Sequence, residues 1–241
     1  MPRHPHARFV ALVQLLARHR PDVEPVAILE QRVLVDGRIV DNPRALVRAD
    51  ASMRVVPARR LRGDVKLSHA LDSFAIVVRG RVALDVGASA GGFTRALLAR
   101  GARRVYAVDV GTGQLVGALR VDPRVVNLEG VNLAEIDRRL VPATVDLVVM
   151  DLSYLAVASA VPQLGAIDVG DAADLVALVK PTFELRSAHL VEHTIDIERA
   201  VGLANRALTA CGWTPTASCA APRTGAARAR EVFVHARRTS R

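Results

Sequence analysis

The sequence contains two cysteines, two lysines and no long apolar run, and each of these shortages narrows the class of protein. Cys211 and Cys219 lack the paired spacing of metal ligands, so we expect two free, packed thiols in a reducing cytoplasm rather than a disulfide. No uncharged run reaches the roughly 18 apolar residues of a membrane span. The apolar segment Phe9–Ala17 contains Gln14 and continues into Arg18 without a cleavage site of small residues, which favours an amphipathic helix over a secretory signal.

Lysine is nearly absent because arginine supplies almost all of the positive charge. Of the 33 basic residues, only Lys66 and Lys180 are lysine. Arginine stays protonated above about pH 12, whereas a buried or cation-flanked lysine can act as a base near neutral pH. The two lysines therefore indicate a catalytic role, and the alternative is that they are ordinary surface residues.

Positive charge is concentrated at the two ends of the chain, whose formal net charge is +9. Residues 1–66 carry 13 basic and 7 acidic side chains, and residues 221–241 carry 6 basic side chains and 1 acidic side chain. Basic ends around a nearly neutral middle predict an anionic partner, of which nucleic acid is the most common. A basic surface that only keeps the protein in solution is the alternative.

Residues 1–56 predict a small α/β module. Helical patterns cover 9–18 and 26–31. The Asp36-Gly37 pair between two β-prone segments predicts a hairpin, and a third strand is expected at 54–56.

Residues 66–241, which follow a basic linker at 57–65, alternate between strand and helix patterns. Strands are expected at 81–86, 104–110, 124–129, 145–151 and 173–179, with helices at 93–100, 113–120, 133–140 and 154–163 between them. A helix at 195–210 and strands at 213–219 and 231–236 complete the pattern. This alternation of helices with nearly continuous apolar strands predicts an α/β fold with a doubly wound, Rossmann-like parallel sheet.

The turn after the first of these strands is rich in glycine and reads Asp85-Val86-Gly87-Ala88-Ser89-Ala90-Gly91-Gly92-Phe93. In a doubly wound fold, such a turn lies at the edge of the sheet where ligands bind. Asp109 ends the next strand and can accept hydrogen bonds from the ribose of a cofactor. The NAD fingerprint requires glycine in place of Ser89, so the loop favours another adenosine-bearing cofactor. A turn that only closes the strand–helix unit is the alternative.

Five segments together carry a resemblance to a known family. They are Arg62–Leu67, Leu84–Thr94, Asp109–Leu115, Asp151–Tyr154 and Val179–Glu184. In these segments the chain resembles the TlyA (haemolysin A-type) ribosomal RNA 2′-O-methyltransferases, which join an S4-like RNA-binding domain to an FtsJ-like catalytic domain. The resemblance implies an S4-like module at 1–56, a Rossmann-like methyltransferase domain at 66–241, and methyl transfer from S-adenosylmethionine to ribosomal RNA or ribosomal subunits.

The resemblance also implies roles for individual residues. The catalytic Lys-Asp-Lys-Glu set of the family falls on Lys66, Asp151, Lys180 and Glu231. Lys180 is then the general base for the ribose 2′-hydroxyl, with a pKa lowered by Lys66 and by burial. The expected cofactor-binding residues are Asp85, Gly87, Ala88, Ser89, Gly91, Gly92, Phe93, Asp109, Val110 and Asp151. The expected RNA-binding residues of the N-terminal module are Arg18, Arg20, Arg32 and Arg38.

Three departures from the family pattern keep other functions open. The segment Leu185–His193 has no glycine where the family has a glycine-rich loop, Arg20-Pro21-Asp22 replaces a Ser-Arg pair, and Gln31 replaces a glycine. A non-catalytic RNA-binding or ribosome-assembly factor that keeps the fold is the main alternative. A small-molecule methyltransferase is a second one, and the basic N-terminal module argues against it.

Overall fold

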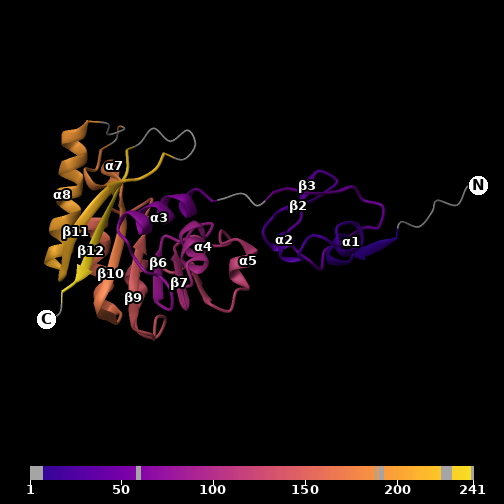
Figure 1. The fold of residues 1–241 in the computed structure, drawn as a ribbon, viewed down its shortest axis with the longest axis horizontal. Coiled ribbons are helices and arrows are strands. Elements are labelled where there is room, and N and C mark those ends of the chain that lie inside the picture. Colours follow the sequence, from indigo (N-terminus) through magenta and orange to yellow (C-terminus); the bar gives the residue numbers. More distant parts are fainter. Residues whose placement is uncertain (1–7, 58–60, 188, 190–192, 224–229, 240–241) are drawn as a thin grey trace, which may run out of the picture. The chain divides into compact units, whose positions relative to one another are not determined.

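A computed structural model describes residues 8–57, 61–187, 189, 193–223 and 230–239, and the chain divides into two compact units (Figure 1). The first unit holds residues 1–59 and 116–121, and the second holds 60–115 and 122–241. None of the helices in the described ranges is both long enough and apolar enough to cross a bilayer. Cys211 and Cys219 are free thiols, as expected.

The N-terminal part of the first unit consists of two small sheets and two helices around one apolar cluster. Its elements are β1 (Phe9–Ala11), α1 (Leu12–His19), α2 (Val26–Leu29), β2 (Val33–Val35), β3 (Arg38–Ile39), β4 (Leu46–Arg48) and β5 (Met53–Val55). Strand β1 pairs with β4, and β2 lies between β3 and β5. The predicted hairpin is confirmed, since Asp36 and Gly37 have φ of 47° and 79°, as a two-residue β-turn requires.

The second unit is built on a seven-stranded sheet with the order β11-β12-β10-β9-β6-β7-β8. Its strands are β6 (Val82–Val86), β7 (Arg104–Asp109), β8 (Val125–Glu129), β9 (Val145–Met150), β10 (Val169–Val179), β11 (Trp213–Ala220) and β12 (Val232–Arg238). Strands β6 to β10 are parallel, whereas β12 runs antiparallel to both β10 and β11. The predicted Rossmann-like α/β fold is therefore confirmed, with an antiparallel pair at one edge.

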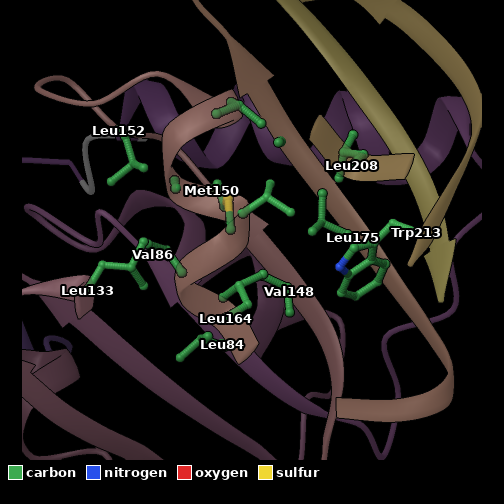
Figure 2. Packing of buried hydrophobic residues seen from close by; sticks show 14 of the residues in the cluster. Leu84, Val86, Leu133, Val148, Met150, Leu152, Leu164, Leu175, Leu208 and Trp213 are labelled. Atoms are coloured by element: carbon green, nitrogen blue, oxygen red, sulfur yellow. The ribbon is translucent and has the colours of Figure 1, made fainter. Parts of the chain in front are cut away.

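Helices cover both faces of this sheet. They are α3 (Arg62–Ser73), α4 (Gly92–Ala99), η1 (Leu133–Glu135), α6 (Val157–Ala160), η2 (Val161–Ala166), α7 (Pro181–Glu184) and α8 (Thr194–Ala210), while α5 (Gly117–Arg120) falls in the first unit. On one face Val234 joins the cluster that contains Leu175, Leu208 and Trp213 (Figure 2). On the opposite face Phe233 contacts Phe93 of α4, because successive strand residues point to opposite sides.

Several expected helices and the linker differ from the structure. The predicted linker at 57–65 is partly wrong, because α3 begins at Arg62 and buries Leu67, Ala70 and Leu71 on one face. The helix expected at 133–140 is only a short 3-10 turn, since the Asp137 side chain accepts hydrogen bonds from the backbone N–H groups of Arg139 and Leu140.

Glycine and an unusual backbone angle shorten two more of the expected helices. The helix expected at 113–120 begins only at Gly117, after Gly113 with φ of 74°. The helix expected at 26–31 ends at Leu29 because Gln31 has φ of 59°, outside the helical region.

Candidate active site

The carboxyl ends of four parallel strands bring most of the predicted site residues to one edge of the sheet. Val86 pairs with Val108 and with Met150, and Met150 pairs with Ala177. The residues that follow these positions include Gly87, Asp109, Asp151 and Lys180. Ligands of open α/β sheets bind at this edge, so the register alone places a candidate site there.

The glycine loop after β6 approaches the end of β9 closely. A Cβ atom at Gly87, where φ is 87°, would lie 2.5 Å from the carbonyl oxygen of Asp151, so a side chain at this position would clash. Ser89 also has a positive φ, of 46°. Its N–H donates to Asp109 Oδ2 over 2.8 Å, and its Oγ donates to Gln114 Oε1 over 3.0 Å. These bonds fix the loop against the residues that follow β7.

Helix α3 packs against the start of α4 through two glycines. A Cβ at Gly92 would lie 2.8 Å from the Cα of Gly63, so a side chain there would separate the helices. Next to this contact, Arg95 and Asp64 form an ion pair of 3.1 Å. This packing fixes the first turn of α3 beside the glycine loop and thereby positions Lys66.

A cavity of about 290 Å³ lies at the glycine loop. Six of the ten predicted cofactor-binding residues line it: Gly87, Ala88, Ser89, Gly92, Phe93 and Asp151. The sequence did not single out Arg62, Gly63 and Ser153, which also line it, although each lies in a segment that carries the family resemblance.

The other four predicted cofactor-binding residues lie around this cavity rather than on its described wall. Gly91 has φ of 91° and immediately precedes α4, and Val110 is exposed beyond β7. Asp109 supports the loop, accepting hydrogen bonds from the N–H groups of Ser89 and Gly111. Asp85 is fully buried and accepts a hydrogen bond of 2.6 Å from the Thr94 hydroxyl. Burial raises the pKa of the Asp85 carboxyl to about 7, so the group binds a proton more readily than an exposed aspartate.

The four predicted catalytic residues form two lysine–carboxylate pairs. Lys180 Nζ lies 2.6 Å from Asp151 Oδ1 and donates a hydrogen bond of 3.0 Å to Ser153 Oγ. Lys66 forms an ion pair with Glu231, which is 165 positions away in the sequence. All four side chains are between 13% and 23% exposed, so each pair is shielded from bulk solvent yet open to a ligand.

The sheet places the two pairs next to each other. Val179 of β10 pairs with Val232 of β12 in antiparallel register. The next residues along the two strands are Lys180 and Glu231, so they face each other one step beyond the paired ends. The structure thus brings the predicted tetrad together at the edge of the sheet, beside the glycine loop.

Glu184 is a positioning residue that the sequence did not single out as part of the site. Its buried carboxylate accepts hydrogen bonds from the N–H groups of Val157, over 2.5 Å, and Ala158, over 3.4 Å. Burial raises the pKa of this carboxyl, and the two backbone bonds oppose that rise. Glu184 therefore ties the helix after Lys180 to the segment that follows Ser153.

The four predicted RNA-binding arginines of the N-terminal unit differ in how they are engaged. Arg18 and Arg38 are exposed. Arg20 forms a bidentate pair with Asp22 at 2.7 and 2.9 Å. Arg32 is more buried and donates to Glu30 over 2.8 Å and to the Val56 carbonyl oxygen over 3.1 Å. Arg32 thus holds the end of β5, whereas Arg18 and Arg38 present their side chains to solvent.

Comparison with known proteins identifies related chains. The family model of the FtsJ-like methyltransferases matches residues 59–238. The chain is 46% identical over 158 residues to the 16S/23S rRNA (cytidine-2′-O)-methyltransferase TlyA of Mycobacterium tuberculosis, a match that covers 64% of this chain and 59% of that protein. The chain therefore spans less than two thirds of the length of this relative.

Solved structures show the same architecture. A "putative hemolysin" from Streptococcus thermophilus is 26% identical, with a TM-score of 0.69, and the match covers 96% of this chain and 89% of that one. An S-adenosylmethionine-dependent methyltransferase from Mesorhizobium loti is 19% identical, with a TM-score of 0.53, over 70% of this chain and 96% of that one. This second likeness concerns the fold alone.

Proposed function

The chain belongs to the FtsJ-like methyltransferase family, and we propose that it transfers a methyl group from S-adenosylmethionine to a ribose 2′-hydroxyl of ribosomal RNA. The observation that carries this proposal is the pairing of Lys180 with Asp151 beside the glycine-loop cavity. The TlyA relative, named as an rRNA cytidine-2′-O-methyltransferase, supports the choice of acceptor.

The glycine-loop cavity fits an adenosine-bearing cofactor. At Gly87 the backbone of the loop comes so close to β9 that a side chain would clash. Asp109 fixes the loop by accepting a hydrogen bond from the N–H of Ser89. We assign the adenosine part to the loop and to Asp109, whose carboxylate oxygens keep lone pairs for ribose hydroxyls. When bound, S-adenosylmethionine supplies a methyl group on a positively charged sulfur that leaves as a neutral thioether.

Lys180 and its neighbours handle the proton of the acceptor. Lys180 would take the proton of the 2′-hydroxyl as that oxygen accepts the methyl group, which bound S-adenosylmethionine would supply. Asp151, 2.6 Å from Nζ, stabilises the ammonium that forms, and Ser153 fixes the position of the amine. The Lys66–Glu231 pair contributes a second fixed charge pair at the rim, so the reaction depends mainly on positioning.

For the organisation of the chain, we propose an S4-like RNA-binding module at 1–56 and a methyltransferase domain at 66–241. We propose that the protein acts on ribosomal RNA or subunits in the cytoplasm. The exposed guanidinium groups of Arg18 and Arg38 support phosphate contacts by the module. Changing both to glutamine should weaken RNA binding and reduce its salt dependence by about one counterion per lost contact. Arg32→Gln should instead lower the stability of the module, as thermal unfolding would show.

The activity is tested with tritiated S-adenosylmethionine and ribosomal RNA or subunits from cells that lack the gene. The protein should label RNA, and mapping of 2′-O-methyl groups in cells with and without the gene should identify the same nucleotide. Lack of labelling on free RNA, immature subunits and mature subunits would favour the non-catalytic assembly factor instead.

A further inference from the structure

A second cavity, of about 310 Å³, opens at the Lys66–Glu231 pair. None of its described lining residues lines the glycine-loop cavity. Helix α3 borders both, because Arg62 and Gly63 line the first cavity and Lys66, one turn later on the same face of the helix, lines the second. This edge of the sheet therefore has a second cavity at the Lys66–Glu231 pair in addition to the glycine-loop cavity.

The walls of the second cavity combine an apolar surface with a basic mouth. Ile197 of α8, Ala221, Pro222 and Val232 contribute apolar side chains. The mouth carries Arg223 and Arg230, both exposed.

The strand register brings the two arginines to the same opening. The N–H of Ala221 donates to the Glu231 carbonyl oxygen over 2.9 Å, just beyond the last pair of the β11–β12 ladder. Arg223 lies two residues after Ala221 and Arg230 lies one residue before Glu231, in the segments that follow β11 and precede β12. A ligand at the mouth can therefore meet both guanidinium groups.

This chemistry matches one nucleotide unit of an RNA strand. A base stacks on apolar side chains, and arginine binds phosphate oxygens through its planar set of donors. The reacting hydroxyl has to reach Lys180 and the glycine-loop cavity, but neither Lys180 nor the glycine loop lines the second cavity. The second cavity therefore lies beside the place of the reacting ribose and does not hold that ribose itself.

Resting on the proposed function, we propose that the second cavity holds the base of a nucleotide next to the methylated one, with the flanking phosphates on Arg223 and Arg230. The enzyme would then select its target partly through the neighbour of the modified nucleotide. An extruded neighbouring base also fixes the register of the strand, which sets which 2′-hydroxyl meets Lys180.

A thermodynamic cycle on the full-length protein tests this assignment. The probes are a fluorescein-labelled uridine 12-mer and a 12-mer of the same ribose-phosphate backbone without bases. Wild-type protein should bind the uridine 12-mer roughly tenfold more tightly, because base stacking is lost in the second probe. Ala221→Phe, which fills the cavity, should bind both probes equally. The pair Arg223→Gln and Arg230→Gln should weaken both probes and lower the salt dependence of binding.

Matched controls separate the cavity from general effects. Ala217 lies on the same strand as the cavity residue Ala220 but does not line the cavity. The variant Ala217→Phe should therefore keep the preference for bases. Arg103→Gln removes a charge next to the start of β7, which three strands of the sheet separate from β12, and should leave both affinities unchanged. Calorimetry with S-adenosylhomocysteine should give wild-type affinity for every variant, which shows that the variants fold.

A second arm uses a fragment of ribosomal RNA around the mapped methylation site. Removing the base of one neighbour should lower methylation by wild-type protein and have no further effect on Ala221→Phe. The assignment is overturned if wild-type protein binds both 12-mers equally or if Ala221→Phe keeps the base preference. It is also overturned if Ala221→Phe becomes insensitive to removal of the base of the methylated nucleotide rather than the base of its neighbour.

Two further outcomes distinguish the assignment from the proposed function. If wild-type protein methylates RNA but Ala221→Phe behaves like Ala217→Phe, the cavity assignment fails and the function stands. If the base preference is present but no RNA or subunit is methylated, the function fails, and with it the assignment to a neighbour of a methylated nucleotide. Displacement of the 12-mer by polyglutamate from wild-type protein but not from Ala221→Phe would assign the cavity to an acidic peptide.

Discussion

The two lysine–carboxylate pairs have the same chemistry but different structural support. Lys180 and Asp151 directly follow β10 and β9, two neighbouring parallel strands inside the sheet. Lys66 lies on α3, and Glu231 precedes β12 in the antiparallel part of the sheet. The backbone ladder positions the first pair, whereas side-chain packing between a helix and a strand positions the second.

We propose that this structural difference corresponds to a division of labour between the pairs. Ladder hydrogen bonds on both sides of β9 and β10 restrict the first pair to one geometry, which suits proton transfer at the reacting atom. The second pair depends on contacts such as Phe93 with Phe233, at a ring distance of 6.1 Å. It can orient a substrate, and small displacements there are expected to cost less than loss of the base.

The largest expected effect comes from replacing Lys180, the proposed base of the first pair. Lys180→Arg keeps the charge but removes the proton acceptor, because arginine does not deprotonate near neutral pH. We expect kcat to fall by roughly 10²–10⁴-fold, with little change in cofactor or RNA affinity. Arg103→Lys is the control, and it should have wild-type kinetics in the tritium assay. A wild-type rate for Lys180→Arg would rule out the base assignment.

The next effect concerns the polar network that joins β10 to β12. These two strands are the ones next to Lys180 of the first pair and Glu231 of the second. Asp174 of β10 is buried and contacts His235 of β12 over 2.8 Å and Arg81 over 2.5 Å. These partners lower the pKa of Asp174 to about 2 against the cost of burial. The carboxylate therefore stabilises the fold fully above about pH 4, and this contribution is lost as the pH falls through about 2.

Asp174→Asn tests this network. The change should cost about 3 kcal/mol at pH 7, because Arg81 and His235 lose their charged partner. In the variant, the free energy of unfolding should also fall by about 2 kcal/mol less than in the wild type as the pH is lowered to 2. Urea unfolding from pH 2 to pH 7 measures both effects. An unchanged acid limb would show that Asp174 is not the group responsible.

A smaller effect is expected from the second pair. Glu231→Gln removes the charge that orients Lys66 but keeps a similar shape, and Lys66→Arg keeps the charge. Each should lower kcat/KM by roughly tenfold, well below the effect at Lys180. If Lys66→Arg equals Lys180→Arg in severity, the two lysines have equivalent roles and the proposed division of labour is wrong.

The smallest effect is expected in the N-terminal unit, which contains neither pair, and it separates stability from catalysis. Gln31 has φ of 59°, a region that favours glycine, and its side chain makes one exposed hydrogen bond of 3.2 Å to Asp41. Gln31→Gly should stabilise the N-terminal unit by roughly 0.5–1 kcal/mol, since relief of strain exceeds the entropic cost of glycine. Thermal unfolding measures the gain, and kcat should not change.

Patterns local in the sequence predicted the strands, the Asp36-Gly37 hairpin and the glycine loop. These features depend on the periodicity of apolar residues and on backbone freedom, which neighbouring residues largely determine. The start of α3 was missed because Arg62 and Gly63 resemble a linker by composition. Its helical state depends on burying Leu67 and Leu71 against the rest of the domain.

Composition by itself set Lys66 and Lys180 apart from the arginines, and the family resemblance added the prediction that Asp151 and Glu231 belong with them. Only the tertiary structure decided how the four residues divide. Lys66 meets Glu231 across 165 positions because α3 packs on α4 through Gly63 and Gly92, and Lys180 meets Asp151 because β9 and β10 are neighbours. The second cavity likewise depends on where the end of β11, the start of β12 and α8 meet. Contacts between distant segments follow from packing and strand order, and local sequence preferences do not encode either.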